Sequence, residues 1–366
     1  RYVRSWPRGS MTPHTDPAET APAAGPAPSE GGAGHRPLAP QLYLLALLGA
    51  ALLVAFWLVF SWALPVERDP QALVRSMRGP SHENWQKAHT LAELLRSPHH
   101  AALRADAALC RELASILDEQ FRTEQFRAAP DDPIQTPFRV YLCRALGEFR
   151  VPDGLPSLLR AAEVSARSGC PEVQCVALEA LAVLASNVGP SAFQNDPRAL
   201  SVLRDASGPG QDAGGSEVSA RIASTATFTL GVVGGPAATQ RLTELLADRR
   251  PDVRYNAATG LARHGELAAL PVLLEMLDAD NFLSLDRPSD AGPPERYREL
   301  VTRNAVRAVT RLAPVVPPGD RSVLSAALAR LHSAPALPAR LRLAVQAAQA
   351  ELHAAHGPPR GSEGGL

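Results

Sequence analysis

The chain has 366 residues, of which 45 % are hydrophobic, and its 37 Lys and Arg residues balance 37 Asp and Glu residues. This length suits two ordinary domains or one long solenoid. The charge balance argues against a dedicated nucleic-acid-binding protein, which normally carries a basic excess. Only 5 % of the residues are aromatic, which favours closely packed helices over sheets.

Residues 1–40 predict a disordered tail. The stretch after Met11 is rich in Pro, Ala, Gly, Ser and Thr, and such a composition cannot bury enough apolar surface to fold. The short tail at 356–366 is predicted to be disordered as well.

Residues 41–64 predict a transmembrane helix. The run Leu42–Leu64 contains no charged residue and is longer than the roughly 20 apolar residues that cross a bilayer. Tyr43 and Trp62 stand near its ends, as interfacial anchors do. Two other readings stay open: a cleaved signal peptide ending near Ala63, and a buried core helix.

Arginines flank this segment unevenly. Arg68, Arg75 and Arg78 follow it, whereas only Arg36 lies close before it. The positive-inside rule therefore predicts a single-pass protein of the cell membrane with its C-terminal domain in the cytoplasm. The lipid bilayer would then be one binding partner, through Leu42–Leu64.

From about residue 70 to residue 355, apolar residues recur at helical spacing, and the sequence repeats itself. The segment from Ile222 aligns without a gap with the segment from Val253, at an offset of 31 residues. In this alignment Ala257 and Leu261 fall on the inner face of a helix. Each unit predicts a longer helix, a turn containing Gly234 or its equivalent, and a shorter helix.

These repeats resemble the HEAT-repeat family, in particular its short bacterial form, which is also found in phycobilisome-lyase-like proteins. The residues that carry the resemblance are Pro251-Asp252-Val253-Arg254, Ala257-Ala258, Leu261 and Gly265. The resemblance implies an all-α fold, an α-solenoid of helical pairs over residues 70–355 that binds protein partners along its surface. We expect about five to seven such pairs.

An insertion at Asp278–Glu295 interrupts the repeats and carries an apolar pair, Phe282 and Leu283. Such a pair either folds back onto the solenoid or binds another protein. Phe282 and Leu283 are therefore the candidate partner-binding residues. An inert surface loop remains the third alternative.

No motif for catalysis, a cofactor or a metal is evident. The glycines of Gly231–Gly235 lack the Lys-Ser/Thr pair of a phosphate-binding loop and are interpreted as helix-ending residues. His99 and His100 are adjacent and so diverge on a helix, whereas Asp131 and Asp132 lie beside prolines in a turn. The four cysteines are interpreted as buried apolar residues.

The sequence therefore predicts a membrane-anchored interaction scaffold, not an enzyme, with an unidentified protein partner and no nucleic acid. An accessory subunit of a membrane complex is the alternative. A lyase is a further one, and it rests only on the resemblance.

The uncharged run Leu42–Leu64 gives a first prediction. The full chain should remain with the membrane fraction after a carbonate wash, because the washing solution does not extract a helix buried in lipid. A shortened chain that begins near Asp69 should be released. Release of the full chain, or a mature N-terminus near Leu64, would contradict the anchor.

Overall fold

The computed structural model describes residues 53–54, 70–79, 81–208, 216–278, 293–335 and 337–354. The chain divides into two units, Arg1–Val66 and Glu67–Leu366. The regular elements of the described ranges are all helices, which confirms the predicted all-α class.

The transmembrane prediction and both tail predictions lie outside the described residues, apart from Leu53 and Val54, which are helical and exposed. Within the described ranges, no helix combines the length and the apolar character needed to cross a bilayer.

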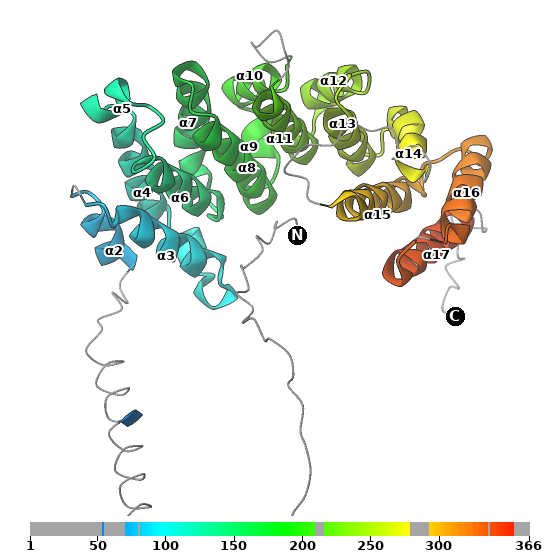
Figure 1. Ribbon diagram of the computed structural model, residues 1–366, viewed down its shortest axis with the longest axis horizontal. Helices are drawn as coiled ribbons and strands as arrows, with labels where there is room; N and C mark the ends of the chain where they lie inside the picture. The colour runs from blue at the N-terminus through cyan, green and yellow to red at the C-terminus, as the bar shows by residue number, and fades with distance from the viewer. Residues whose placement is uncertain are drawn as a thin grey trace, which may run out of the picture. The chain divides into compact units, whose positions relative to one another are not determined.

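The helices of Glu67–Leu366 form two stacked rows, which Figure 1 shows side by side. The first row consists of α3 (Asn84–Arg96), α6 (Thr136–Gly147), α8 (Pro171–Val188), α11 (Glu217–Val233), α13 (Pro251–Arg263), α15 (Pro294–Leu312) and α17 (Ala339–Ala354). The second row consists of α4 (Ala107–Gln120), α7 (Leu155–Ser168), α10 (Pro197–Ala206), α12 (Pro236–Leu245), α14 (Leu270–Leu277) and α16 (Pro318–Ser333). Short helices complete the unit: α2 (Pro70–Ser76), α5 (Glu124–Ala128) and α9 (Ser191–Gln194).

Each first-row helix packs against the next along the row, and second-row helices such as α7, α12 and α14 also pack against the first-row helix that follows them. The repeating helical pair of the sequence is therefore confirmed as the structural unit. It makes most of its contacts with its immediate neighbours, as in solenoids.

Proline and aspartate set many of the helix starts. Proline is the first residue of α8, α10, α12, α13, α15 and α16, where its missing N–H costs nothing and its fixed φ suits the helix. The side chain of Asp106 caps α4 by accepting hydrogen bonds from the N–H groups of Ala108 (2.9 Å) and Leu109 (3.0 Å). Asp196 caps α10 in the same way, so the chain marks its own helix boundaries.

The core lies between the two rows and follows the predicted register. Ala257 and Leu261 of α13 are both fully buried. The four cysteines are buried and free, as interpreted from the sequence. Burial raises the pKa of Cys110 and Cys143 to about 12, so these thiols are protonated and unreactive at neutral pH.

The glycines of Gly231–Gly235 include one that is not a helix-ending residue. Gly234 and Gly235 end α11 with positive φ, as expected. Gly231, however, lies within α11, where a Cβ would come within 2.7 Å of the Cα of Gly260 on α13. The interpretation of Gly231 was therefore wrong, because the alignment of one repeat with the next does not show which residues face each other between neighbouring helices.

Polar side chains also tie neighbouring first-row helices together. Thr229 on α11 donates to the carbonyl of Leu178 on α8 at 3.0 Å, and Asn187 on α8 donates to the carbonyl of Gly147 on α6 at 3.0 Å. Asn256 on α13 donates to the carbonyl of Ser224 on α11 at 3.0 Å. These bonds use backbone carbonyls as acceptors, so they fix the lateral register of the row.

The close contact of Gly231 with Gly260 generates a second prediction. Gly231→Ala should lower the free energy of unfolding by about 1–3 kcal/mol, because the new methyl group must push two backbones apart. Alanine favours a helix more than glycine does, so without the contact the substitution should raise the free energy of unfolding. A decrease therefore indicates the contact.

Gly319 supplies the matched control. It lies in the first turn of α16 with nothing within 4 Å of an added Cβ, so Gly319→Ala should be neutral or stabilising by up to about 1 kcal/mol. Equal effects of the two substitutions in thermal or urea unfolding would contradict the close approach of α11 and α13.

Candidate interaction surface

The first row presents one solvent-facing strip, which we call the first-row face. Because an interior first-row helix is covered by two row neighbours and by the second row, its exposed side chains point away from the second row. On α8 these include Glu179 and Val183, and on α11 they include Arg221 and the half-buried Thr225 and Phe228. Each residue lies three or four positions from the next along its helix, as one helical face requires.

Aromatic side chains gather at the α3–α6 part of this face. Tyr141 on α6 stacks against Trp85 (centroids 6.2 Å apart) and His89 (4.7 Å) on α3. The guanidinium of Arg144 lies 5.2 Å from the centroid of the Tyr141 ring. These half-buried rings offer both apolar area and a polar edge, which is the composition of many interface anchors.

A shallow hollow lies beside this aromatic group. It has a volume of about 330 Å³ and is lined by His89, Thr90, Glu93, Leu94, Ser97 and His100. Its lining comes from α3 and the short helical turn Pro98–His100.

Arginines dominate the α11–α15 part of the first-row face. Arg263 on α13 lies over the ring of Phe228 on α11, with its guanidinium 5.9 Å from the ring centroid. Burial lowers the pKa of Arg263, and the nearby positive charge of Arg311 lowers it further. Arg303 and Arg307 lie on the same helix as Arg311, α15.

Several arginines elsewhere in the repeat unit have acidic partners. Arg198 on α10 forms a bidentate pair with Glu163 on α7, at 2.9 and 2.7 Å. This pair lowers the pKa of Glu163 through the hydrogen bond from Arg198. Arg160 with Asp118, Arg111 with Asp153 and Arg254 with Glu275 are further pairs.

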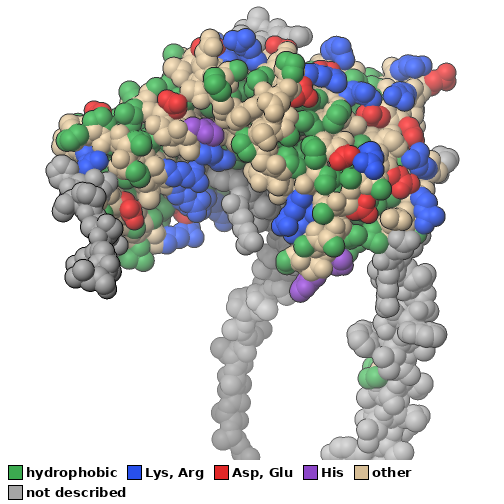
Figure 2. All heavy atoms as spheres, turned by 180° about the vertical axis from the view of Figure 1, so that it is seen from behind, with side chains coloured by type: hydrophobic (Ala, Val, Ile, Leu, Met, Phe, Trp, Pro, Cys, Tyr) green, Lys and Arg blue, Asp and Glu red, His purple; other side chains and the backbone are tan. Residues whose placement is uncertain are grey.

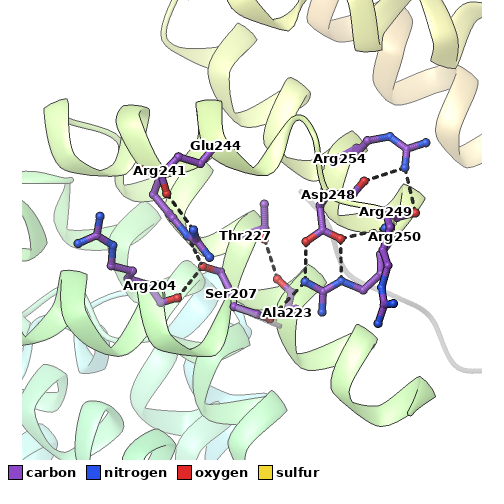
Figure 3. A network of polar contacts seen from close by, with 11 residues as sticks. Arg204, Ser207, Ala223, Thr227, Arg241, Glu244, Asp248, Arg249, Arg250 and Arg254 are labelled. Carbon is purple, nitrogen blue, oxygen red and sulfur yellow. Dashed lines mark hydrogen bonds and ion pairs between the residues drawn. The ribbon is translucent and has the colours of Figure 1, made fainter. Parts of the chain in front are cut away.

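A polar network joins α10, α12 and the start of α13 (Figure 3). The guanidinium of Arg250 donates to both carboxylate oxygens of Asp248, at 2.8 and 2.7 Å, and to the carbonyl of Gly208 at 3.2 Å. Arg254 donates to the backbone carbonyl of Asp248 at 2.8 Å. The side chains of Arg250 and Asp248 are only 17 % and 15 % exposed, so this pair is shielded from solvent.

The second branch of the network reaches α12. Arg241 donates to the hydroxyl of Ser207 at 3.1 Å, and Ser207 donates to the carbonyl of Arg204 at 2.8 Å. Figure 3 shows the Arg241 branch at Ser207 and Arg204, beside the end of α10. The network holds neighbouring units in register, and nothing in it resembles an acid/base or nucleophile arrangement.

The structure describes some of the residues singled out from the sequence and not others. Phe282 and Leu283 lie outside the described residues, so their role stays a prediction. Asp132 lies in a turn and accepts hydrogen bonds from the N–H of Ile134 and the side chain of Gln125, as a turn residue does. One ring nitrogen of His264 lies 2.9 Å from the carbonyl oxygen of Gly231.

Metal binding has no support in the described ranges, where no three His, Cys, Asp or Glu side chains converge on one point. The arginine group of α13 and α15 and the aromatic group around Tyr141 were both missed by sequence reasoning. The spacing of Arg303, Arg307 and Arg311 was the available signal, because positions four apart share a helix face.

The two rows of stacked pairs define an α-helical repeat protein. Residues 216–284 match the HEAT-repeat family, so the repeat type inferred from the alignment of 222–277 is confirmed over this range. The comparison of the sequence with curated proteins gives no significant match.

Several solved structures are similar at a low level. Human deoxyhypusine hydroxylase in complex with glycerol is 17 % identical, with 81 % of this chain and 99 % of that chain covered and a TM-score of 0.30. An engineered protein is 14 % identical, with 79 % and 98 % covered and a TM-score of 0.31. A designed armadillo repeat protein is 20 % identical, with 72 % and 98 % covered and a TM-score of 0.33. Scores this low carry no inference about function.

The shielded pair of Asp248 and Arg250 generates a prediction about pH. Burial disfavours the charged carboxylate, but hydrogen bonds from Arg250 and the charges of Arg250 and Arg249 outweigh it, so the pKa of Asp248 is lowered. A carboxyl group with a lowered pKa stabilises the fold above its unfolded pKa of about 3.9, and this contribution is lost as the pH falls through the folded value.

Asp248→Asn should therefore lower the free energy of unfolding by about 1–3 kcal/mol at pH 7, and the difference from the unaltered protein should shrink below about pH 4. Glu244→Gln, at an exposed partner of Arg241, is the control and should change stability little. Urea unfolding across this pH range measures both. A deficit in Asp248→Asn that is constant down to pH 3 would contradict this account.

Proposed function

We propose that this chain is a membrane-tethered helical repeat scaffold that binds a protein segment across its first-row face. The observation that carries the proposal is the side-chain content of this face. Aromatic side chains around Tyr141 and arginines around Arg263 are presented there on rigid, mutually packed helices. Such residues are enriched in the centres of protein interfaces.

The match of residues 216–284 to HEAT repeats supports the same reading, because stacked repeats offer an extended surface with little internal motion. The proposal favours binding over catalysis, since the polar networks of the described residues serve to join helices.

The tether is the part of the proposal that rests on sequence alone. The uncharged run Leu42–Leu64 would place the repeats at the cytoplasmic side of the cell membrane. Confinement to a membrane surface raises the effective concentration of partners held at that surface. A modest affinity would then suffice for assembly.

Site-directed photo-crosslinking in cells that express the full chain tests the proposal. A photoreactive phenylalanine at Val183 or Ser186, both exposed on α8 of the first row, should give discrete adducts with one recurring protein. The same residue at Ala166 on α7 or Thr243 on α12, exposed in the second row, should not give those adducts.

Adducts with the same protein from first-row positions alone support a scaffold with a defined binding face. Equal labelling from both rows, or no adduct above the background of the unaltered chain, would contradict it.

A further inference from the structure

Three arginines of α15 form a straight basic ridge. Arg303, Arg307 and Arg311 are spaced by four residues, so they lie one turn apart on a single face of the helix. Arg307 and Arg311 are exposed, and Arg303 is half-buried. No carboxylate pairs with any of the three within the described ranges, and the Nε atom of Arg303 has no hydrogen-bond partner there.

A fourth arginine extends the ridge to the neighbouring helix. Arg263 is exposed on α13, which packs against α15, and the positive charge of Arg311 adds to the lowering of the Arg263 pKa. We call Arg263, Arg303, Arg307 and Arg311 the arginine ridge. The face seen in Figure 2 shows several such groups of Lys and Arg side chains. An anion that sits among these like charges is attracted by each of them, so their contributions to its binding add.

A carboxylate on α15 pairs with an arginine of α17 instead of with the ridge. Arg340 on α17 pairs with Glu299, which lies on α15 one turn before Arg303. The same helix therefore pairs a carboxylate with an arginine at one end and leaves the other end positive. The chain has equal numbers of basic and acidic residues, so the positive charge of the ridge comes from where its arginines lie in the fold.

The spacing of the ridge suggests the shape of what it binds. Residues four apart on a helix are separated by about 6 Å along its axis, at about 1.5 Å per residue. In an extended chain, alternate side chains point the same way and are separated by about 6.6 Å, at about 3.3 Å per residue. Acidic side chains at every second position of an extended segment would thus meet successive arginines. Phe228, beneath Arg263, offers an aromatic surface where such a segment leaves α15.

We propose that the arginine ridge binds an extended acidic segment of a partner protein, in which Asp or Glu recurs at every second residue. The proposal deepens the function proposed above and rests on it, since it assigns the chemistry of the partner at one part of the first-row face. Arginine suits this role because its planar guanidinium engages a carboxylate with two hydrogen bonds.

Fluorescence anisotropy with the full chain in an uncharged detergent tests the proposal. The probe is a labelled short peptide in which Glu alternates with Ala. Two comparison peptides are an isomer with all its Glu residues in one block and a version with Gln in place of Glu. The alternating peptide should bind most tightly, the block isomer more weakly and the Gln version not measurably. The affinity should also fall as salt is raised.

Two triple variants locate the binding. Arg303→Gln, Arg307→Gln and Arg311→Gln together should weaken binding of the alternating peptide about tenfold, as expected for the loss of several exposed ion pairs. Arg122→Gln, Arg127→Gln and Arg167→Gln remove the same charge from exposed positions near α5 and α7, and this control should change the affinity less than about twofold. All six side chains are exposed or half-buried, and a thermal melt of each variant verifies that it folds.

Equal losses in the two triple variants would overturn the proposal, and so would a block isomer that binds as well as the alternating peptide. A lipid surface is the other outcome. If the unaltered chain sediments with phosphatidylserine vesicles, the ridge variant does not, and the three peptides bind alike, the proposal is overturned in favour of a lipid surface. Crosslinking from Val183 is independent of these arginines. If its adducts persist while the peptide test fails, the scaffold stands and only the acidic partner is lost.

Discussion

The structure depends on how closely the first-row helices approach one another. Between α11 and α13 the approach is limited by two glycines, Gly231 and Gly260, whose backbones would clash with any added Cβ. Between α6 and α8 a Cβ at Gly147 would lie 3.0 Å from the backbone of Ala180. With small residues at the crossings, hydrogen bonds such as that from Asn187 to the carbonyl of Gly147 can span from one helix to the next. Side-chain bulk at the same places would break both the packing and these bonds.

This close row determines where function can reside. Because its helices are covered on three sides, each can present only a narrow strip to a partner, and the strips of successive helices lie next to one another. Tyr141 meets Trp85 and His89 across one such boundary, and Arg263 meets Phe228 across another. The aromatic group and the Arg263–Phe228 contact are therefore each made by two neighbouring repeats.

Sequence reasoning was sufficient for the helices and their inner faces. The gapless alignment of 222–246 with 253–277 placed Ala257 and Leu261 in the core, where the structure has them, because burial repeats with the helical period. It could not find Gly231 as a contact residue or the partners of His264, since these depend on which turns of neighbouring helices face each other. The spacing of four residues in the sequence indicates that the arginines of α15 share one face of the helix. The sequence does not show whether carboxylates pair with them, because such partners can lie far away in sequence. The chosen candidates, Phe282 and Leu283, fall in a stretch outside the described residues.

The contact between Gly231 and Gly260 has a mechanical consequence. At this point the distance between the two helix axes is set by main-chain atoms and not by side-chain volume, so it cannot be adjusted by exchanging one side chain for another. The bonds from Asn256 to Ser224 and between His264 and Gly231 join the same two helices. A larger residue at either glycine would therefore shift every repeat on one side of the crossing relative to those on the other.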